Sequence, residues 1–276
     1  MSEKVSIDLA AYAKDVRKIS PLVHHITNYV TVTDCANITL AVGASPVMAD
    51  DPAEAADMTS ISQCLVINIG TLNARTVESM LAAGRVANGS GIPVVFDPVG
   101  CGATPFRTEM TKRILKEIHV DVIRGNISEI ACIAGLHSCT KGVDASAEDR
   151  GTDAVVVARN VSQIYHVVTA VSGAVDIVTD GIQAFAVENG CEMMSRITGS
   201  GCMETSVLGS FCGARSENIF EAVLCGMIYM GLCGEIAEEK AGKIGLGAFR
   251  GALIDAAGNM TVERLIKGAK YHEIAL

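Results

Sequence analysis

The first half of the chain alternates short apolar runs with longer segments whose apolar residues recur at helical spacing. Residues 64–70, 93–97 and 120–123 form apolar runs of the kind found in strands that are buried on both faces. Helical segments at residues 75–87 and 108–118 separate these runs. The alternation predicts parallel strands joined by right-handed crossover helices. Further helices are expected at residues 8–17, 33–42, 52–62 and 153–164, and a further strand at residues 44–49.

The pattern changes after residue 165. Three short strand-like runs follow at residues 166–172, 175–179 and 183–187, and turn signals such as Asp180-Gly181 separate them. Beyond residue 199 the pattern is mostly helical. We therefore expect one α/β domain over residues 1–276. It would have a largely parallel central sheet with helices on both faces, a short antiparallel extension and a helical C-terminus.

Composition narrows the class of protein. Hydrophobic residues make up 49% of the chain and aromatic residues only 4%, so aliphatic side chains and methionine must build the core. The net charge of −9 disfavours nucleic acid and anionic lipid as partners, although it does not exclude an anionic substrate. The ten cysteines have no C-x-x-C spacing, and we expect them to be reduced and mostly buried.

Two further features favour a cytoplasmic protein. Residues 1–17 carry acidic side chains and do not match a signal peptide. The apolar stretch at residues 219–236 contains Glu221 and Glu235, which is typical of a buried core helix rather than of a membrane span.

A glycine-rich turn is the first candidate site. Gly199 and Gly201 precede an apolar helix expected at residues 203–212. Glycines let the backbone approach a ligand, and a helix N-terminus offers N–H donors, so the turn could hold a transferring phosphoryl group. Cys202 would lie in the first helical turn, where the dipole favours its thiolate, and could accept the proton of an attacking hydroxyl. The alternative is an ordinary turn with a packed cysteine.

Other phosphate-binding motifs are missing from the sequence. It contains neither G-x-x-x-x-G-K-[ST] nor G-x-G-x-x-G. This argues against a P-loop protein and against a dinucleotide site of the Rossmann type.

Acidic residues follow two of the predicted strands. Asp97 ends one strand, and Glu129 begins the helix after the next strand, close to Asn126. The carboxyl ends of parallel strands face the ligand crevice, so these carboxylates could organise Mg²⁺ and Arg124 could neutralise phosphate charge. The alternatives are an Asp-Pro turn, a carboxylate that stabilises a helix dipole, and a surface arginine.

Together these features resemble the ribokinase-like fold, which combines N-x-x-E after a strand, an acidic strand end and a late G-x-G before a helix. Further blocks, in the same order along the chain, are similar to the hydroxyethylthiazole kinases. They lie at residues 20–24, 26–28, 43–49, 68–72, 97–107, 124–126 and 198–202.

The resemblance implies ATP-dependent phosphorylation of the hydroxyethyl group of 4-methyl-5-(2-hydroxyethyl)thiazole, in thiamine salvage. It implies that Met48, Asn28 and Gly199 contact the thiazole. Cys202 takes the place that an aspartate base holds in most ribokinase-like enzymes. We expect the N–H groups from Gly199 through Gly201 to Cys202 to stabilise charge on the transferred phosphoryl group.

On the nucleotide side, the resemblance implies that Arg124, Asn126 and Ser172 contact ATP. Asp97 and Glu129 would organise Mg²⁺ around the phosphates. Ser172 stands where threonine is expected in the family, but it keeps the hydroxyl group. The family is typically trimeric with sites between subunits, so we expect a homotrimer.

Three other functions remain open at this point. The chain could be another ribokinase-like kinase of a small alcohol, such as a pyrimidine or pyridoxal. It could be an ATP-dependent hydro-lyase that repairs hydrated nicotinamide on the same fold, or a non-catalytic protein that binds a vitamin precursor. The combination of Asp97, Glu129 and Cys202 argues against the last, because a binding protein does not need all three.

Overall fold

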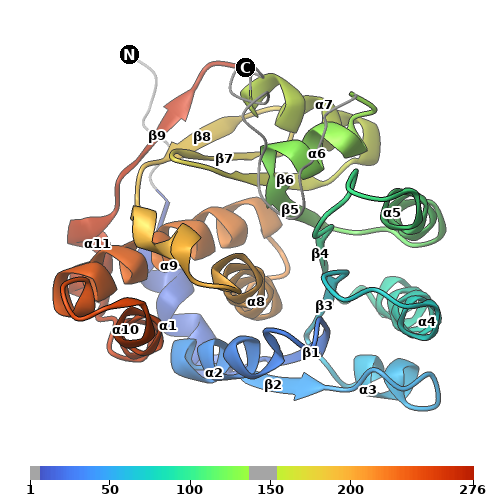
Figure 1. Ribbon diagram of the computed structural model, residues 1–276, viewed down its shortest axis with the longest axis horizontal. Coiled ribbons are helices and arrows are strands. Elements are labelled where there is room, and N and C mark those ends of the chain that lie inside the picture. The colour runs from blue at the N-terminus through green and yellow to red at the C-terminus, as the bar shows by residue number, and fades with distance from the viewer. Residues whose placement is uncertain (1–6, 137–153) are drawn as a thin grey trace.

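Within residues 7–136 and 154–276, the part of the chain that this computed structural model describes, the strands form one mixed nine-stranded sheet (Figure 1). The spatial order is β2-β1-β3-β4-β5-β6-β7-β8-β9, parallel from β2 to β6 and antiparallel from β6 to β9. The strands are β1 (Leu22–Ile26), β2 (Ser45–Met48), β3 (Cys64–Asn68), β4 (Val94–Asp97), β5 (Val122–Asn126), β6 (Val168–Ser172), β7 (Asp176–Thr179), β8 (Ala184–Val187) and β9 (Tyr271–Ile274).

Helices cover both faces of this sheet. They are α1 (Leu9–Ile19), α2 (Val32–Val42), α3 (Ala55–Ser60), α4 (Ala74–Ser90), α5 (Pro105–Glu117), α6 (Ile127–Ile133), α7 (Ala154–Tyr165), α8 (Ser200–Ala214), α9 (Ile219–Ala241), α10 (Leu246–Gly258) and α11 (Val262–Gly268), with a short 3₁₀ helix η2 (Glu192–Arg196). One face carries α3 to α7, and the other carries α1, α2 and α8 to α11 (Figure 1). The predicted α/β architecture is confirmed.

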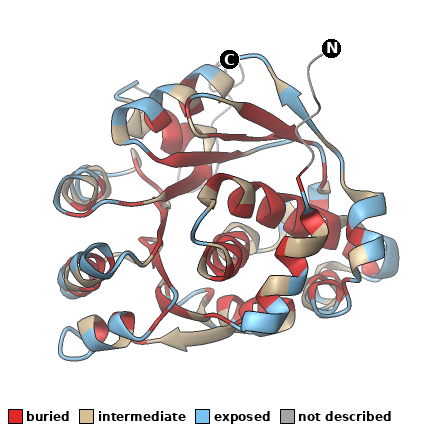
Figure 2. Cartoon of the chain, turned by 180° about the vertical axis from the view of Figure 1, so that it is seen from behind, coloured by how far each residue is buried: buried red, intermediate tan, exposed pale blue. Residues whose placement is uncertain are grey.

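Strand β3 shows why the central strands are mostly apolar before their carboxyl ends. Cys64 and Val66 belong to the hydrophobic core on the α8 side, whereas Leu65 and Ile67 belong to the core on the α4 side. Successive side chains of a strand point to opposite faces, so a strand covered on both faces is apolar at most positions, and the polar Asn68 stands at the end of β3. Figure 2 shows the central strands and the inner faces of the helices as buried, with exposed outer faces on the helices, whereas the edge strands β2 and β9 are intermediate or exposed.

Helix α9 is the long apolar element that the sequence assigned to the core. Its length and composition would suffice to cross a membrane, but 83% of its most apolar window is buried inside the protein. Helix α8 lies beside it and packs directly against β1, β3 and β4. The expected core helix is therefore confirmed.

Two strands were not predicted. Strand β1 carries His24 and His25, both buried, and these polar residues interrupt the apolar run that marks a buried strand. Strand β9 ends the chain at the edge of the sheet, where only its terminal positions Tyr271 and Ile274 are partly buried. The C-terminal region is helical through α11, as expected, but it closes with this strand rather than with a helix.

Substituting Gly209 with alanine tests how closely α8 packs on the sheet. An added Cβ would lie 2.5 Å from Val66 Cγ2, so the helix or strand must shift. Overpacking outweighs the gain in helix propensity, and we expect Gly209→Ala to lower the free energy of unfolding by about 1–2 kcal/mol in urea denaturation.

The matched control is Gly251→Ala in α10, where an added Cβ meets no described atom within 4 Å. Helix propensity alone should raise stability there by up to about 1 kcal/mol. Equal effects of the two substitutions would show that α8 does not make this close contact.

Candidate active site

The start of α8 is built by two glycines that lie against other elements. Gly199 caps the helix with a positive φ of 87°, a conformation that favours glycine. An added Cβ would lie 2.5 Å from Thr31 Cγ2 at Gly199, and 2.5 Å from Arg124 Nη1 at Gly201. The glycines therefore admit close neighbours, and they place the N-terminus of α8 directly beside the end of β5.

Cys202 lies in the first turn of α8, as predicted. Its Sγ accepts hydrogen bonds from Asn28 Nδ2 at 3.2 Å and from Asn68 Nδ2 at 3.3 Å. Asn68 is the last residue of β3, and Asn28 follows β1. Two side-chain amides from neighbouring strand ends thus fix the position of the sulfur.

The electrostatics of Cys202 differ from the prediction. Burial raises the pKa of its thiol, the negative charge of Asp97 raises it further, and the hydrogen bonds from Asn28 and Asn68 offset this only in part. The net shift is therefore opposite to the expectation, which considered the helix dipole without burial. At neutral pH Cys202 presents a thiol.

Asp97 is the buried last residue of β4. Its Oδ2 accepts hydrogen bonds from Asn68 Nδ2 and from Thr205 Oγ1, both at 2.8 Å. Its Oδ1 is buried without a hydrogen-bond partner among the described residues. Asn68 therefore links Asp97 to Cys202, a connection that the sequence analysis did not identify.

Glu129 has a structural role as well as a place in the site. Asn126 Oδ1 accepts from Glu129 N at 3.0 Å, and Glu129 Oε2 accepts from Asn126 N at 2.9 Å, which is a capping box at the start of α6. Glu129 Oε1 accepts from Gly100 N at 2.8 Å, which holds the loop after β4. Burial and the charge of Asp97 raise the pKa of Glu129 to about 7.

Arg124 is buried, so the alternative of a surface arginine is wrong. Its Nη2 lies 2.6 Å from Glu204 Oε2 and donates to Ser172 Oγ at 3.0 Å. Asp176, buried at the start of β7, accepts from Gly173 N at 2.8 Å, and burial together with Glu204 raises its pKa. Sequence reasoning missed Glu204 and Asp176, although a glutamate inside the apolar run of α8 is a detectable signal.

These groups leave a surplus of buried acid at the carboxyl edge of the sheet. Among the described residues, Asp97, Glu129, Asp176 and Glu204 all interact electrostatically with the single guanidinium of Arg124. Burial raises the pKa of Asp97, Glu129 and Asp176 and so disfavours their charged forms, which a bound cation would favour. The unpartnered Oδ1 of Asp97 and the raised pKa of Glu129 therefore fit Mg²⁺, which binds carboxylate oxygens directly or through water.

Arg107 fixes the loops that carry this edge. Its Nη1 donates to Ile69 O at 2.5 Å and to Val99 O at 2.6 Å, and its Nη2 donates to Gly70 O at 2.6 Å. The guanidinium thus joins the loop after β3 to the loop after β4. No signal in the sequence distinguishes this arginine from one on the surface.

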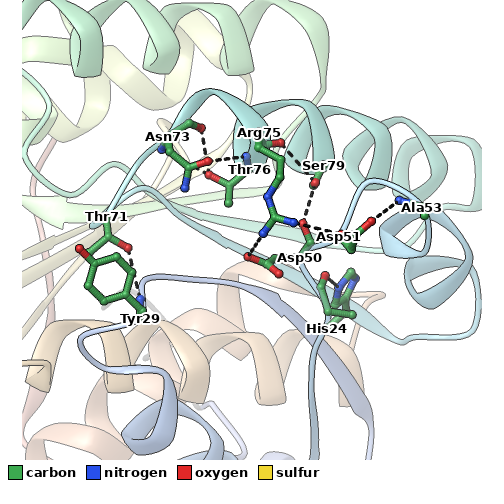
Figure 3. Close-up of polar contacts among 11 residues, drawn as sticks. His24, Tyr29, Asp50, Asp51, Ala53, Thr71, Asn73, Arg75, Thr76 and Ser79 are labelled. Carbon is green, nitrogen blue, oxygen red and sulfur yellow. Dashed lines mark hydrogen bonds and ion pairs between the residues drawn. The ribbon is translucent and has the colours of Figure 1, made fainter.

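The segment that follows β1 is also hydrogen-bonded to a neighbouring loop. Tyr29 N donates to Thr71 Oγ1 at 3.2 Å, which connects it to the loop after β3 (Figure 3). The neighbouring residue Asn28 donates to Cys202 Sγ at 3.2 Å. Met48 ends the edge strand β2 opposite His25, so it shares the sheet edge but has no polar link to the cluster among the described contacts.

Comparison with known sequences identifies relatives along nearly the whole chain. A model of the "Hydroxyethylthiazole kinase family" matches residues 13–263. The hydroxyethylthiazole kinase of Clostridium beijerinckii is 54% identical over 277 residues, covering 99% of this chain and 100% of its own. That of Ruminiclostridium cellulolyticum is 53% identical over 261 residues, covering 94% and 95% of the two chains.

Comparison with solved structures agrees. The hydroxyethylthiazole kinase protein from Pyrococcus horikoshii OT3 has a TM-score of 0.88 and 37% identity, covering 97% of this chain and 99% of its own. A pyridoxal kinase from Staphylococcus aureus, with a TM-score of 0.56 and 16% identity over 75% of this chain and 84% of its own, shares the fold alone. The predicted ribokinase-like fold is confirmed, and the chain belongs to the hydroxyethylthiazole kinase family.

Proposed function

We propose that the protein transfers the γ-phosphoryl group of ATP to the hydroxyl of 4-methyl-5-(2-hydroxyethyl)thiazole, as part of thiamine salvage. The observation that carries this proposal is the convergence of Cys202 and Asp97 on the amide of Asn68. Cys202, which would bind the hydroxyl, and the acidic edge at Asp97, which would bind a cation, thereby lie on either side of Asn68. Membership of the kinase family supplies the reaction type.

On the substrate side, Cys202 orients the hydroxyl for attack. A neutral thiol is a weak base for an alcohol, so its contribution is hydrogen bonding and position. In a loose transition state the hydroxyl loses its proton late, to an oxygen of the transferred phosphoryl group and from there to solvent. Met48, Asn28 and Gly199 contact the thiazole. The N–H groups from Gly199 through Gly201 to Cys202 stabilise charge on the transferring phosphoryl group.

On the nucleotide side, Arg124, Asn126 and Ser172 line the phosphate region. The direct bond between Arg124 and Ser172, and the pairing of Asn126 with Ser172 across β5 and β6, support this grouping. Asp97 and Glu129 hold Mg²⁺, which neutralises phosphate charge when it is bound.

We also propose a homotrimer with sites between subunits, in the cytoplasm. Tyr29 and Val30 are 78% and 56% exposed next to Asn28, and Met48 lies on the edge strand. A neighbouring subunit would cover these apolar side chains and complete the thiazole pocket. The free cysteines of the described residues and the burial of α9 support a cytoplasmic location.

The direct test is release of ADP by the purified protein with Mg-ATP and a panel of alcohols. We expect turnover with the thiazole alcohol, and little with pyridoxal or a hydroxymethylpyrimidine.

Cys202→Ser should slow turnover by about 10²-fold and leave the KM for ATP nearly unchanged. The half-buried Cys191, replaced by serine, is the control. Thiazole binding without ADP release would favour a binding protein, and an unaffected Cys202→Ser variant would reduce Cys202 to packing.

Asn68→Ala tests whether the shared amide positions the reacting groups. Loss of both donated hydrogen bonds frees Cys202 and Asp97 to move, and misplacement of this kind can slow a reaction by about 10²-fold. We expect kcat to fall and the KM for ATP to change little. Asn68→Asp, which keeps the acceptor for Gly70 N but loses the donor, should also be slow.

Asn88→Ala serves as the control for this amide. Asn88 exchanges two hydrogen bonds of 2.8 Å with the backbone of His119 on the surface, so its loss should affect stability but not kcat. Equal rates for the Asn68 and Asn88 variants would contradict the positioning role.

Glu129 should make stability depend on pH. Its folded pKa of about 7 lies above its ordinary value of 4.5, so the stability linked to its proton is fully present below pH 4.5 and is lost as the pH rises through about 7. The loss amounts to about 3 kcal/mol. Urea denaturation without ligands should show that Glu129→Gln flattens this part of the pH profile.

The same variant should require more free Mg²⁺ for activity at saturating ATP. Glu221→Gln is the matched control, because Glu221 occupies the same position after Asn218 at the start of α9. An unchanged Mg²⁺ titration in Glu129→Gln would remove Glu129 from the metal site.

A further inference from the structure

Two cysteines outside the site just described face each other. Cys101, in the loop after β4, donates its thiol hydrogen bond to Cys132 on α6, with the Sγ atoms 3.1 Å apart. A disulfide has an S–S distance of about 2.05 Å, so closing the bond needs a movement of only about 1 Å. From the sequence we expected the cysteines to be reduced and mostly buried, with no pair singled out.

The two segments are already held in register by other contacts. Gly100 and Gly102, with φ of 73° and 89°, form the tight turn around Cys101, whose N–H donates to Pro98 O at 2.8 Å. Cys132 lies one helical turn after Glu129, which accepts from Gly100 N at 2.8 Å. The sulfur atoms therefore meet because the backbone on both sides is fixed.

The two thiols have opposite character. Cys101 is buried, and its pKa is raised by the hydrogen bond to Cys132 and by burial. Cys132 is half-buried, and the hydrogen bond from Cys101, the hydroxyl of Thr108 and the charge of Lys112 lower its pKa to about 6. Cys132 is therefore the half-exposed thiol of the pair and the one whose pKa is lowered, whereas the pKa of Cys191 and that of Cys202 are raised.

We propose that Cys101 and Cys132 form a redox-modification site that closes to an intrachain disulfide on reaction with a small-molecule disulfide. The Cys132 thiolate attacks one sulfur of the small disulfide and expels one small thiolate, leaving a mixed disulfide on Cys132. Cys101 gives its proton to that thiolate, attacks Cys132 Sγ and expels the second small thiolate, which takes a proton from solvent. The two protein thiols lose two electrons, and the small disulfide gains them as two thiols.

The bond would tie the loop after Asp97 to the helix that begins with Glu129. This consequence rests on the proposed function, because these residues form the proposed Mg-ATP region. Drawing the sulfur atoms together shifts the Gly100 loop relative to α6, on the nucleotide side of the site. We expect the KM for ATP to rise severalfold in the disulfide form, with little change in the KM for the thiazole alcohol, and to recover on reduction.

The test is to incubate the reduced protein with oxidised glutathione, block free thiols and map peptides by mass spectrometry. We expect a cross-linked pair of peptides containing Cys101 and Cys132, lighter by two hydrogen atoms, which dithiothreitol separates. This measurement on the unaltered chain needs no variant to fold. A cross-link between other cysteines, or no reaction at Cys132, would overturn the proposal.

Single variants then separate the two roles. Cys101→Ser should stop at a stable glutathione adduct on Cys132, and Cys132→Ser should leave Cys101 unmodified. Cys191→Ser, a half-buried cysteine elsewhere, should behave as the parent protein. A glutathione adduct that persists on Cys132 of the parent would show that Cys101 does not resolve it.

The KM for ATP of the disulfide form is measured independently of the peptide mapping. A mapped disulfide with an unchanged KM for ATP would overturn its effect on the nucleotide region. A reduced protein that phosphorylates no thiazole alcohol would count against the proposed function, and the mapped disulfide would still stand.

Discussion

The guanidinium of Arg124 is buried together with carboxyl groups from four different elements, and the rest of the site is arranged around this concentration of charge. Glu204 pairs with it directly, while Asp97, Glu129 and Asp176 share its field. Removing one partner from a buried pair typically costs about 3–5 kcal/mol, because the other charge is left without compensation. The N-terminus of α8 can approach this cluster only because glycine occupies position 201.

That arrangement gives the acidic edge and the region of Cys202 different electrostatic properties. The acidic edge is short of positive charge, which is what Mg²⁺ and a triphosphate would bring together. Across Asn68 from this edge, Cys202 is kept neutral by burial and by Asp97. A neutral hydrogen-bonding group is well suited to an uncharged alcohol. In the proposed mechanism, the fold therefore separates the binding of phosphate charge from the positioning of the hydroxyl.

Much of this was predictable from the sequence, for local reasons. The apolar runs predicted the parallel strands. Residues at the carboxyl ends of parallel strands lie at one edge of the sheet, so Asp97 and Glu129 could be expected near each other. The glycine-rich turn before an apolar run predicted that Cys202 lies in the first turn of a helix. The alternation of buried strands and amphipathic helices was sufficient for the fold class.

The remainder depends on contacts between distant segments. The pKa of Cys202 was predicted in the wrong direction, because the helix dipole is visible in the sequence and the burial beside Asp97 is not. Strand β1 was missed because His24 is buried with its own polar partners, Thr59 Oγ1 and Ala49 O, which only the fold supplies. Asn68 looks like any polar strand end until the two groups it joins are in place.

The most direct measurement is a crystal structure of the protein with the thiazole alcohol, Mg²⁺ and a non-hydrolysable ATP analogue. We predict the alcohol oxygen within hydrogen-bond distance of Cys202 Sγ, and the metal and phosphates against Asp97 and Glu129. A thiazole bound away from Cys202, or phosphates bound on the opposite edge of the sheet, would contradict this account.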